Sequence, residues 1–291
     1  MVGRKLTAGR VAISVLVVLA VLAAALPFVH VIALSLSSNS AILRGAVGLL
    51  PVQPTLMFYG EALGDITILR SLLVTIQVTF IYTVLALAMT IAGAYPLSKR
   101  RLAGRGLFLM LILITMYFSG GLIPQYLLVR SLGLLNTTWS LIFPILISAF
   151  NLIILKTFFE SVPTELEDSA YIDGASEATT LLRIYLPLSK PVLATLALFY
   201  AVARWNTFQD AMFYINEPKI YPLQMKLSFL VLNASARAIM EQERGQGIAE
   251  FVAEEGIKAA TIMVATVPIL LVYPWLQRYF IRGVMVGAIK G

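Results

Sequence analysis

The sequence contains no cysteine and one histidine, and only 13% of its 291 residues are charged. The lack of cysteine excludes disulfides, thiolate chemistry and metal sites built on cysteine. The single histidine, His30, lies inside an apolar run, where we expect a structural role and not metal binding. A soluble domain of this size would carry about twice as much charge. The composition therefore argues against an ordinary soluble domain.

The short motifs of common catalytic sites are also missing. We find no GxxxxGK[ST] phosphate loop, no HExxH, no GxSxG and no CxxC. The chain is therefore not expected to hydrolyse ATP by itself, and we predict a non-enzymatic protein with no catalytic residue, metal or cofactor of its own. If it moves a solute uphill, the energy has to come from an ion gradient or from a partner.

What the sequence does contain is apolar residues, which make up 59% of the chain and give a mean hydropathy of +0.87. Six stretches exceed the roughly 20 residues that a helix needs to cross a bilayer. We therefore predict an all-α, polytopic membrane protein that forms a single domain over residues 1–291, with no internal repeat. The six predicted transmembrane helices lie near residues 11–36, 68–97, 106–129, 138–159, 188–213 and 258–281.

The net charge of +7 comes from short basic clusters beside these stretches, such as KRRLAGR at 99–105. This pattern is typical of loops kept on the cytoplasmic side of a membrane, so nucleic acid is not an expected partner. With six spans, both termini and the loop at 160–187 would lie in the cytoplasm. The long loop at 214–257 would lie outside.

The loop at 160–187 contains an acidic stretch, ELEDSAYIDGASEATTLLRIYLP, at residues 165–187. Its pattern predicts two short helices around a break, with carboxylates in the first turn of the first helix. Gly174 can adopt the left-handed conformation that ends this helix, and Ser176 can cap the second. The stretch is either a solvated loop that acidity keeps polar or an ordered surface that docks a partner.

The fifth predicted span carries a polar group of residues near its end, in ARWNTFQDA. One interpretation places Arg204 and Asp210 in an interfacial belt, paired with each other. The other places the group on the wall of a translocation pathway, where amides, charges and an aromatic ring can hold a sugar. An arginine there would suit a carboxylate. The residues of this substrate-pathway prediction are Arg204, Trp205, Asn206, Gln209 and Asp210.

The acidic stretch resembles the EAA loop of permease subunits of binding-protein-dependent ABC importers. That family pattern is EAA, three residues, Gly, nine residues, Ile, any residue and Leu-Pro. The matching positions here are Asp168, Ser169, Ala170, Gly174, Ile184, Leu186 and Pro187. Asp168 replaces the family's Glu, and Ser169 replaces its first Ala. Four other stretches resemble the carbohydrate-uptake branch, most of all its lipoprotein-dependent and alginate-oligosaccharide importers: 118–144, 150–163, 196–215 and 279–291.

The resemblance implies a type I importer permease fold, in a bacterial inner membrane, that passes an oligosaccharide by alternating access. It implies a second homologous permease, two ATPase subunits that use ATP and Mg²⁺, and an extracytoplasmic solute-binding protein, with membrane lipid around the spans. An acidic, uronate-type substrate is plausible. The alternative is an ion-coupled secondary transporter, for which Asp210 is the only fair ion-binding acid.

The resemblance also assigns residues to the contact with the ATPase. Asp168 would meet a basic residue of the ATPase, and Gly174 would make the turn. A glycine-rich C-terminal region would approach the same partner through Gly283, Gly287, Lys290 and Gly291. The coupling residues so implied are Glu167, Asp168, Ser169, Ala170, Tyr171, Asp173, Gly174, Ala175, Ile184, Leu186 and Pro187.

Overall fold

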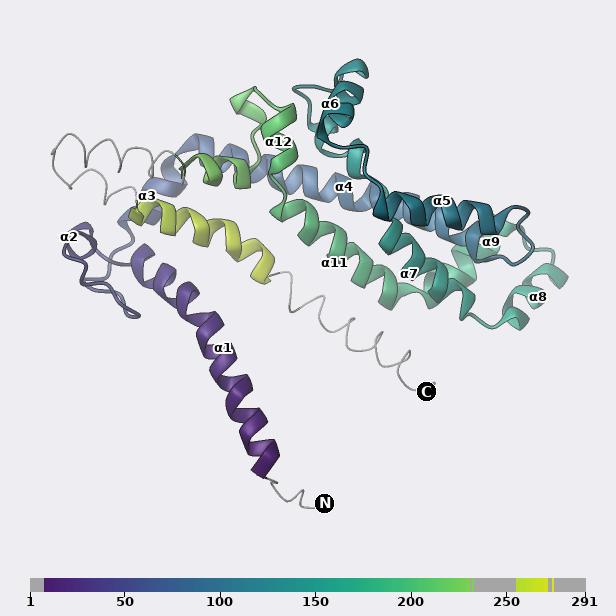
Figure 1. Cartoon of the computed structure of the whole chain (residues 1–291), viewed down its shortest axis with the longest axis horizontal. Helices are drawn as coiled ribbons and strands as arrows, with labels where there is room; N and C mark the ends of the chain where they lie inside the picture. The colour runs from purple at the N-terminus through teal and green to yellow at the C-terminus, as the bar shows by residue number, and fades with distance from the viewer. Residues whose placement is uncertain (1–7, 231, 233–254, 272–273, 275–291) are drawn as a thin grey trace. The chain divides into compact units, whose positions relative to one another are not determined.

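The computed structural model describes residues 8–230, 232, 255–271 and 274. Over these residues the regular structure is helical and includes no strand, which confirms the all-α prediction (Figure 1). The α-helices are α1 (Ala8–Ser35), α2 (Asn39–Leu43), α3 (Met57–Gly64), α4 (Ile66–Ser98), α5 (Arg105–Tyr117), α6 (Leu122–Ser131), α7 (Ala149–Glu160), α8 (Thr164–Ile172), α9 (Glu177–Thr180), α10 (Leu186–Leu188), α11 (Lys190–Asn206) and α12 (Gln209–Tyr214). Residues 223–230 and 255–271 are helical as well.

Short helical turns of other types connect several of these elements. Three are 3₁₀ turns, η1 (Thr138–Leu141), η2 (Phe143–Ile145) and η4 (Pro218–Ile220). The fourth, η3 (Leu181–Tyr185), is a π-helical turn.

The chain forms two compact units, and each is described by itself. Unit 1 consists of Met1–Leu69 and Lys226–Val267, and unit 2 of Arg70–Met225 and Pro268–Gly291. In unit 1, the span Ile13–Ser35 has a mean hydropathy of 2.8 and none of its most apolar window is buried, as expected for a helix in contact with lipid. The ring of Phe58 is fully buried against Gly256, where an added Cβ would lie 2.3 Å from it. Only glycine allows this close approach.

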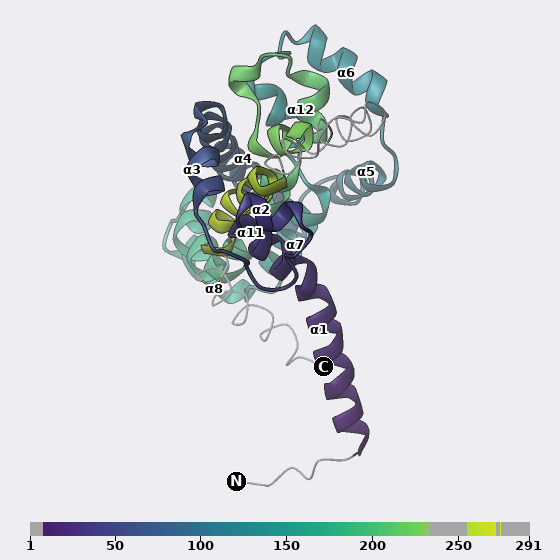
Figure 2. The ribbon, with the colours of Figure 1, turned by 90° about the vertical axis from the view of Figure 1, so that its left-hand side faces the viewer.

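Unit 2 is built around aromatic and aliphatic side chains where α4, α7, η3 and α11 meet. Inside it, the Thr90 hydroxyl of α4 lies 2.6 Å from the Tyr200 hydroxyl of α11. At another part of the unit α6 packs beside α12 (Figure 2). The rings of Tyr126 and Tyr214 are stacked between these two helices. The core cluster consists of Ala94, Tyr95, Leu155, Phe159, Val162, Tyr185 and Leu196.

The helices differ from the predicted spans in their continuity. Two described helices, Ile13–Ser35 and Ile66–Ser98, are long and apolar enough to cross a membrane alone. Three bent helix pairs also pass this test, so that up to five spans fit the described residues if each pair is one span. Two pairs cover the predicted spans 106–129 and 138–159, whereas the first helix of the third pair, Glu177–Leu188, lies almost wholly in the predicted loop 160–187. The bends measure 112° between α5 and α6, 53° before α7 and 82° before α11.

The bends have local causes that hydropathy does not detect. Gly121, at a φ of +84°, precedes α6, and Pro144 lies in η2 before α7. Pro191 opens α11, where the first turn needs no N–H donor. The last predicted span, 258–281, and the outer loop, 214–257, are only partly described. Six spans in one domain therefore stay a prediction.

Candidate functional site

The acidic stretch folds as α8 and α9 around a tight turn. Asp173 ends α8, and Gly174 follows with a φ of +75°. The Gly174 N–H donates to the Tyr171 carbonyl at 3.0 Å, and the Ala175 N–H donates to the Ala170 carbonyl at 2.9 Å. This is the Schellman arrangement, in which a left-handed glycine lets two backbone donors close the last turn of a helix. Ser176 then caps α9 by accepting a hydrogen bond from the Thr179 N–H.

A wider helical turn follows α9. The Leu186 N–H donates to the carbonyl of Leu181, five residues back, and the next residue, Pro187, has no N–H to donate. A proline in a helix removes one backbone hydrogen bond, and a single π turn can accommodate that loss. In this turn Tyr185 is buried in the core cluster of unit 2. The second half of the acidic stretch therefore packs against the core of unit 2.

The Glu167 carboxylate of α8 forms the centre of a polar network, which we call the Glu167 network. Lys99, just after α4, donates to it at 2.6 Å, and the Tyr185 hydroxyl donates to it at 2.7 Å. Lys99 also donates to the Tyr185 hydroxyl at 2.9 Å, and the Tyr171 hydroxyl donates to Glu167 at 3.2 Å. The side chains of Lys99 and Glu167 are only 10% and 12% exposed. Both charged groups are therefore mostly shielded from water, and each compensates the charge of the other.

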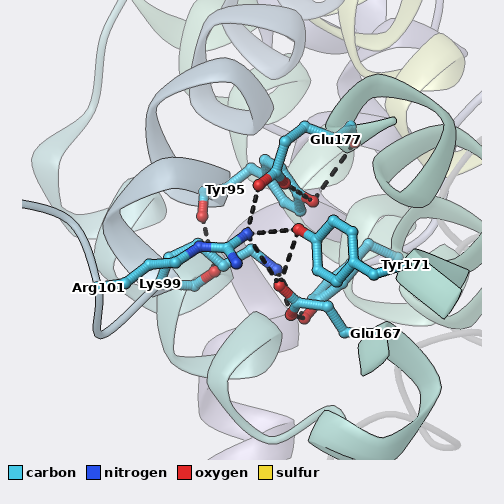
Figure 3. A network of polar contacts seen from close by, with 8 residues as sticks. Tyr95, Lys99, Arg101, Glu167, Tyr171 and Glu177 are labelled. Carbon is cyan, nitrogen blue, oxygen red and sulfur yellow. Dashed lines mark hydrogen bonds and ion pairs between the residues drawn. The ribbon is translucent and has the colours of Figure 1, made fainter. Parts of the chain in front are cut away.

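The second half of the Glu167 network is centred on Arg101. Its guanidinium donates to Tyr171 and to Glu177 of α9, and it lies 3.4 Å from Glu167. Figure 3 shows the Arg101 guanidinium pointing toward both Glu177 and Tyr171. The Tyr95 hydroxyl of α4 donates to Glu177 at 2.8 Å. Both α8 and α9 are therefore fastened to the end of α4 by charge-assisted hydrogen bonds.

Cation–π contacts add to this fastening. The Lys99 ammonium lies 4.3 Å from the centre of the Tyr95 ring and 4.0 Å from that of the Tyr185 ring. Such contacts are stronger where the cation is shielded from water. The ammonium is thus held on two sides by rings and on a third by Glu167.

The electrostatics of the site keep Glu167 ionised. Burial by itself would raise the pKa of the Glu167 carboxyl, but hydrogen bonds from Lys99 and Tyr185, together with the Lys99 charge, lower it below its usual value. A carboxyl whose folded pKa is lowered stabilises the fold above its unfolded pKa. That contribution is lost as the pH falls through the lower, folded pKa. The network is therefore intact at neutral pH.

A second polar centre lies at the break between α11 and α12. The Arg204 guanidinium pairs with Asp210 and also donates to the Leu141 carbonyl of η1 and the Thr207 carbonyl, both at 3.0 Å. The Arg204 side chain is only 2% exposed. A buried arginine of this kind is stable only because its donors are satisfied. It ties α11, the turn after it and η1 together.

Residues 104–286 match the model of a family described as "Binding-protein-dependent transport system inner membrane component". The chain belongs to this family. The predicted resemblance of the chain to permease subunits of binding-protein-dependent importers is therefore confirmed. The chain is a permease of the inner membrane, and membership does not favour an ion-coupled secondary transporter.

Individual proteins agree with the family assignment. Protein LplC of Bacillus subtilis (strain 168) is 46% identical over 266 residues, which cover 91% of this chain and 89% of that protein. The polygalacturonan/rhamnogalacturonan transport system permease protein YtcP of the same organism is 43% identical over 266 residues, with 91% and 92% covered. A crystal structure of a bacterial ABC transporter involved in the import of the acidic polysaccharide alginate matches with a TM-score of 0.85 at 32% identity, and covers 96% of this chain and all of that one.

The permease brings only some of the predicted coupling residues into one cluster. Glu167 and Tyr171 belong to the Glu167 network, and Ile184 and Leu186 pack on the core cluster. Ala170 is buried and Ala175 half-buried. Those that lie exposed on the surface are Asp168, Ser169, Asp173, Gly174 and Pro187. The predicted C-terminal contacts, Gly283, Gly287, Lys290 and Gly291, lie outside the described residues.

The predicted substrate-pathway residues also separate into two groups. Arg204 and Asp210 are paired, as one interpretation of the sequence expected, and Trp205 is buried. Asn206 and Gln209 are exposed.

Sequence reasoning missed most of the Glu167 network. The basic loop at 99–105 was assigned only to membrane orientation, and Tyr95, Tyr185 and Glu177 were not singled out as partners. A usable signal was present, because an acidic stretch and a basic loop were predicted on the same side of the membrane. Their pairing across more than sixty positions depends on the packing of α4 beside α7 and η3, which sequence spacing does not give.

Proposed function

We propose that this permease is one of two membrane subunits of an ATP-driven importer of a carboxylate-bearing oligosaccharide. The other members are a homologous permease, two ATPase subunits that bind ATP and Mg²⁺, and an extracytoplasmic solute-binding protein. Both termini and α8 lie in the cytoplasm of a bacterial cell. Apart from substrate and lipid, these proteins are its partners, and nucleic acid is not.

The observation that carries this proposal is the two-sided character of α8. One side is fastened to α4 through Glu167. The other exposes Asp168 together with two apolar side chains, Leu166 at 42% and Ile172 at 86% exposure. Exposed apolar groups on an ordered acidic helix are typical of a surface that docks a partner. We assign this side to the ATPase.

The two sides of α8 together suggest how motion of the ATPase reaches the membrane spans. Closure of the ATPase pair on ATP moves α8, and the Glu167 network passes the displacement to the end of α4. Because α4 and α11 are joined inside unit 2 at Thr90 and Tyr200, the motion reaches the break that carries Arg204. Rigid helices that switch between two arrangements are the usual basis of alternating access. Asp210, held by Arg204, is poorly placed to bind a coupling ion.

The proposed substrate class rests on the similar transporters of polygalacturonan and of alginate, which are both polymers of uronic acids. In this proposal the exposed amides of Asn206 and Gln209 contact the sugar, and Trp205 supports them. Arg204 and Asp210 belong to the same pathway by holding the break in shape.

The substrate proposal predicts a preference that ATPase assays can measure. The assembled complex is reconstituted with its binding protein and supplied with a uronate oligosaccharide or a neutral oligosaccharide of equal length. Stimulation of ATPase activity is expected to be at least several-fold greater with the uronate. The Asn206→Ala and Gln209→Ala variants should reduce this stimulation without lowering basal activity. Equal stimulation by both sugars would contradict the acidic substrate and leave the transport function intact.

The turn between α8 and α9 gives a second prediction. A side chain at Gly174 would meet no atom within 4 Å, so any effect of substitution comes from the backbone. A left-handed conformation costs an ordinary residue roughly 1–2 kcal/mol, whereas asparagine tolerates it better. Gly174→Val is expected to reduce binding-protein-stimulated ATPase activity several-fold in a complex that still assembles, and Gly174→Asn should remain close to wild type. Unchanged stimulation in Gly174→Val would show that this turn is not needed for coupling.

A further inference from the structure

A basic cleft lies beside α8 and borders the face that we assign to the ATPase, with which it shares Asp168. It has a volume of about 860 Å³ and is formed by the end of α4, the loop before α5, the end of α7 and the start of α8. This volume falls within the roughly 300–1,000 Å³ typical of small-molecule sites. Its charged lining residues are Lys99, Arg100, Arg101, Arg105, Lys156, Glu160, Glu167 and Asp168.

The charges that line the basic cleft do not balance. Five cations and three carboxylates line the cleft, and Glu177, outside the lining, pairs with Arg101, so one positive charge remains in excess. Glu160 is shared by Arg105 and Lys156, so one carboxylate serves two cations. Arg100 is exposed and forms no ion pair with any residue that the structure describes. The basic cleft therefore offers positive charge that an anion could bind.

The position of the basic cleft indicates which anion. Arg105, in its lining, is also the first residue of α5. None of the thirteen residues of α5 is buried, and the helix is apolar almost throughout, with Leu107, Phe108 and Met110 among its exposed side chains. The cations thus lie where an apolar, exposed surface begins. A ligand that fits both parts has an anionic head and an apolar tail.

We propose that the basic cleft binds the phosphate of an anionic membrane phospholipid, whose acyl chains run along α5. Clusters of Lys and Arg at the end of a membrane span attract anionic headgroups, and each cation near the surface contributes favourably. Arg100 and Lys156 supply charge from two different sides of the cleft, and Arg105 marks its boundary with the acyl chains. The proposal needs only that the chain lies in a membrane and is independent of the transported substrate.

The test counts bound lipid on the full-length permease in its complex. Nanodiscs are prepared with phosphatidylcholine alone or with phosphatidylglycerol added, and the retained lipid is measured by native mass spectrometry. We expect phosphatidylglycerol to be retained in preference to phosphatidylcholine. Arg100→Gln should weaken its retention about fivefold, and Arg100→Gln with Lys156→Gln more than tenfold. Arg183→Gln removes an exposed charge from η3, outside the cleft, and should leave retention unchanged.

Four results would overturn the proposal. The first is equal retention of both lipids by the wild type. The second is equal loss in Arg183→Gln and Arg100→Gln, which would indicate general surface charge. The third is competition by millimolar inorganic phosphate that is as effective as that of phosphatidylglycerol. The fourth is unchanged lipid retention in Arg100→Gln together with weaker binding of the ATPase. These outcomes would assign the cleft to a soluble anion or to an acidic segment of the partner. Thermal unfolding of each variant shows whether a loss comes from the site or from the fold.

Discussion

Lys99→Met is expected to lower substrate transport by the assembled complex about tenfold or more while the ATPase subunits stay bound. Lys99 is the main partner of Glu167, and both side chains are mostly buried. Removing one member of a buried ion pair typically costs about 3–5 kcal/mol, because the other charge is left without compensation. Arg101 and two tyrosines still contact Glu167, so the loss should lie near the lower end. The helix α8 would then move without carrying α4 along.

The partner variants make this prediction specific. Glu167→Gln should reduce transport to a similar extent, because it removes the charge that holds both Lys99 and Arg101. In the double variant Lys99→Met with Glu167→Leu the buried site becomes apolar, which is often close to neutral for stability. We expect it to recover part of the lost transport. Arg130→Gln, which removes an exposed charge from α6, should behave as the wild type.

The readout is the number of sugar molecules moved for each ATP hydrolysed, together with copurification of the ATPase. A fall in this ratio with intact assembly supports transmission through the Glu167 network. Wild-type ratios in both single variants would mean that α8 drives the spans by another route.

Arg204→Met is expected to lower the midpoint of thermal unfolding by several degrees. The substitution leaves two backbone carbonyls and the Asp210 carboxylate without their donor in a buried setting. The expected loss is again about 3–5 kcal/mol. Arg204→Lys keeps the charge but cannot reproduce the planar fork, so it should be intermediate.

A double-mutant cycle separates a structural Arg204 from one that recognises substrate. Asp210→Leu removes the partner charge, and the double variant with Arg204→Met should be less destabilised than the sum of the two single changes. If Arg204 instead bound a sugar carboxylate directly, Arg204→Met would leave thermal unfolding near that of the wild type and abolish the preference for uronates. That result would contradict the role that we assign to the ion pair.

The local features of the acidic stretch could be predicted from sequence, because they follow short-range rules. A glycine after a helical run predicts the left-handed turn at Gly174, and a serine before Glu177 predicts the cap at Ser176. Both are present in the structure. The ion pair between Arg204 and Asp210 could also be predicted, because the two residues are only six positions apart.

Features that depend on tertiary packing could not be predicted in this way. Lys99 and Glu167 meet only because α4, α7 and η3 share one core cluster. The bend at Gly121 was missed because hydropathy averages over a window and does not register a single left-handed residue. Whether a charged residue is exposed or committed to a partner likewise depends on its neighbours in space, as Arg204 illustrates.

We propose that this permease uses ATP, through its partners, to import a sugar delivered by a binding protein. The most direct measurement is uptake of labelled oligosaccharide into proteoliposomes that contain the whole complex. We predict uptake only with ATP on the ATPase side and loaded binding protein on the other, and no dependence on a clamped proton or sodium gradient. Uptake that persists without ATP and follows an ion gradient would contradict the account.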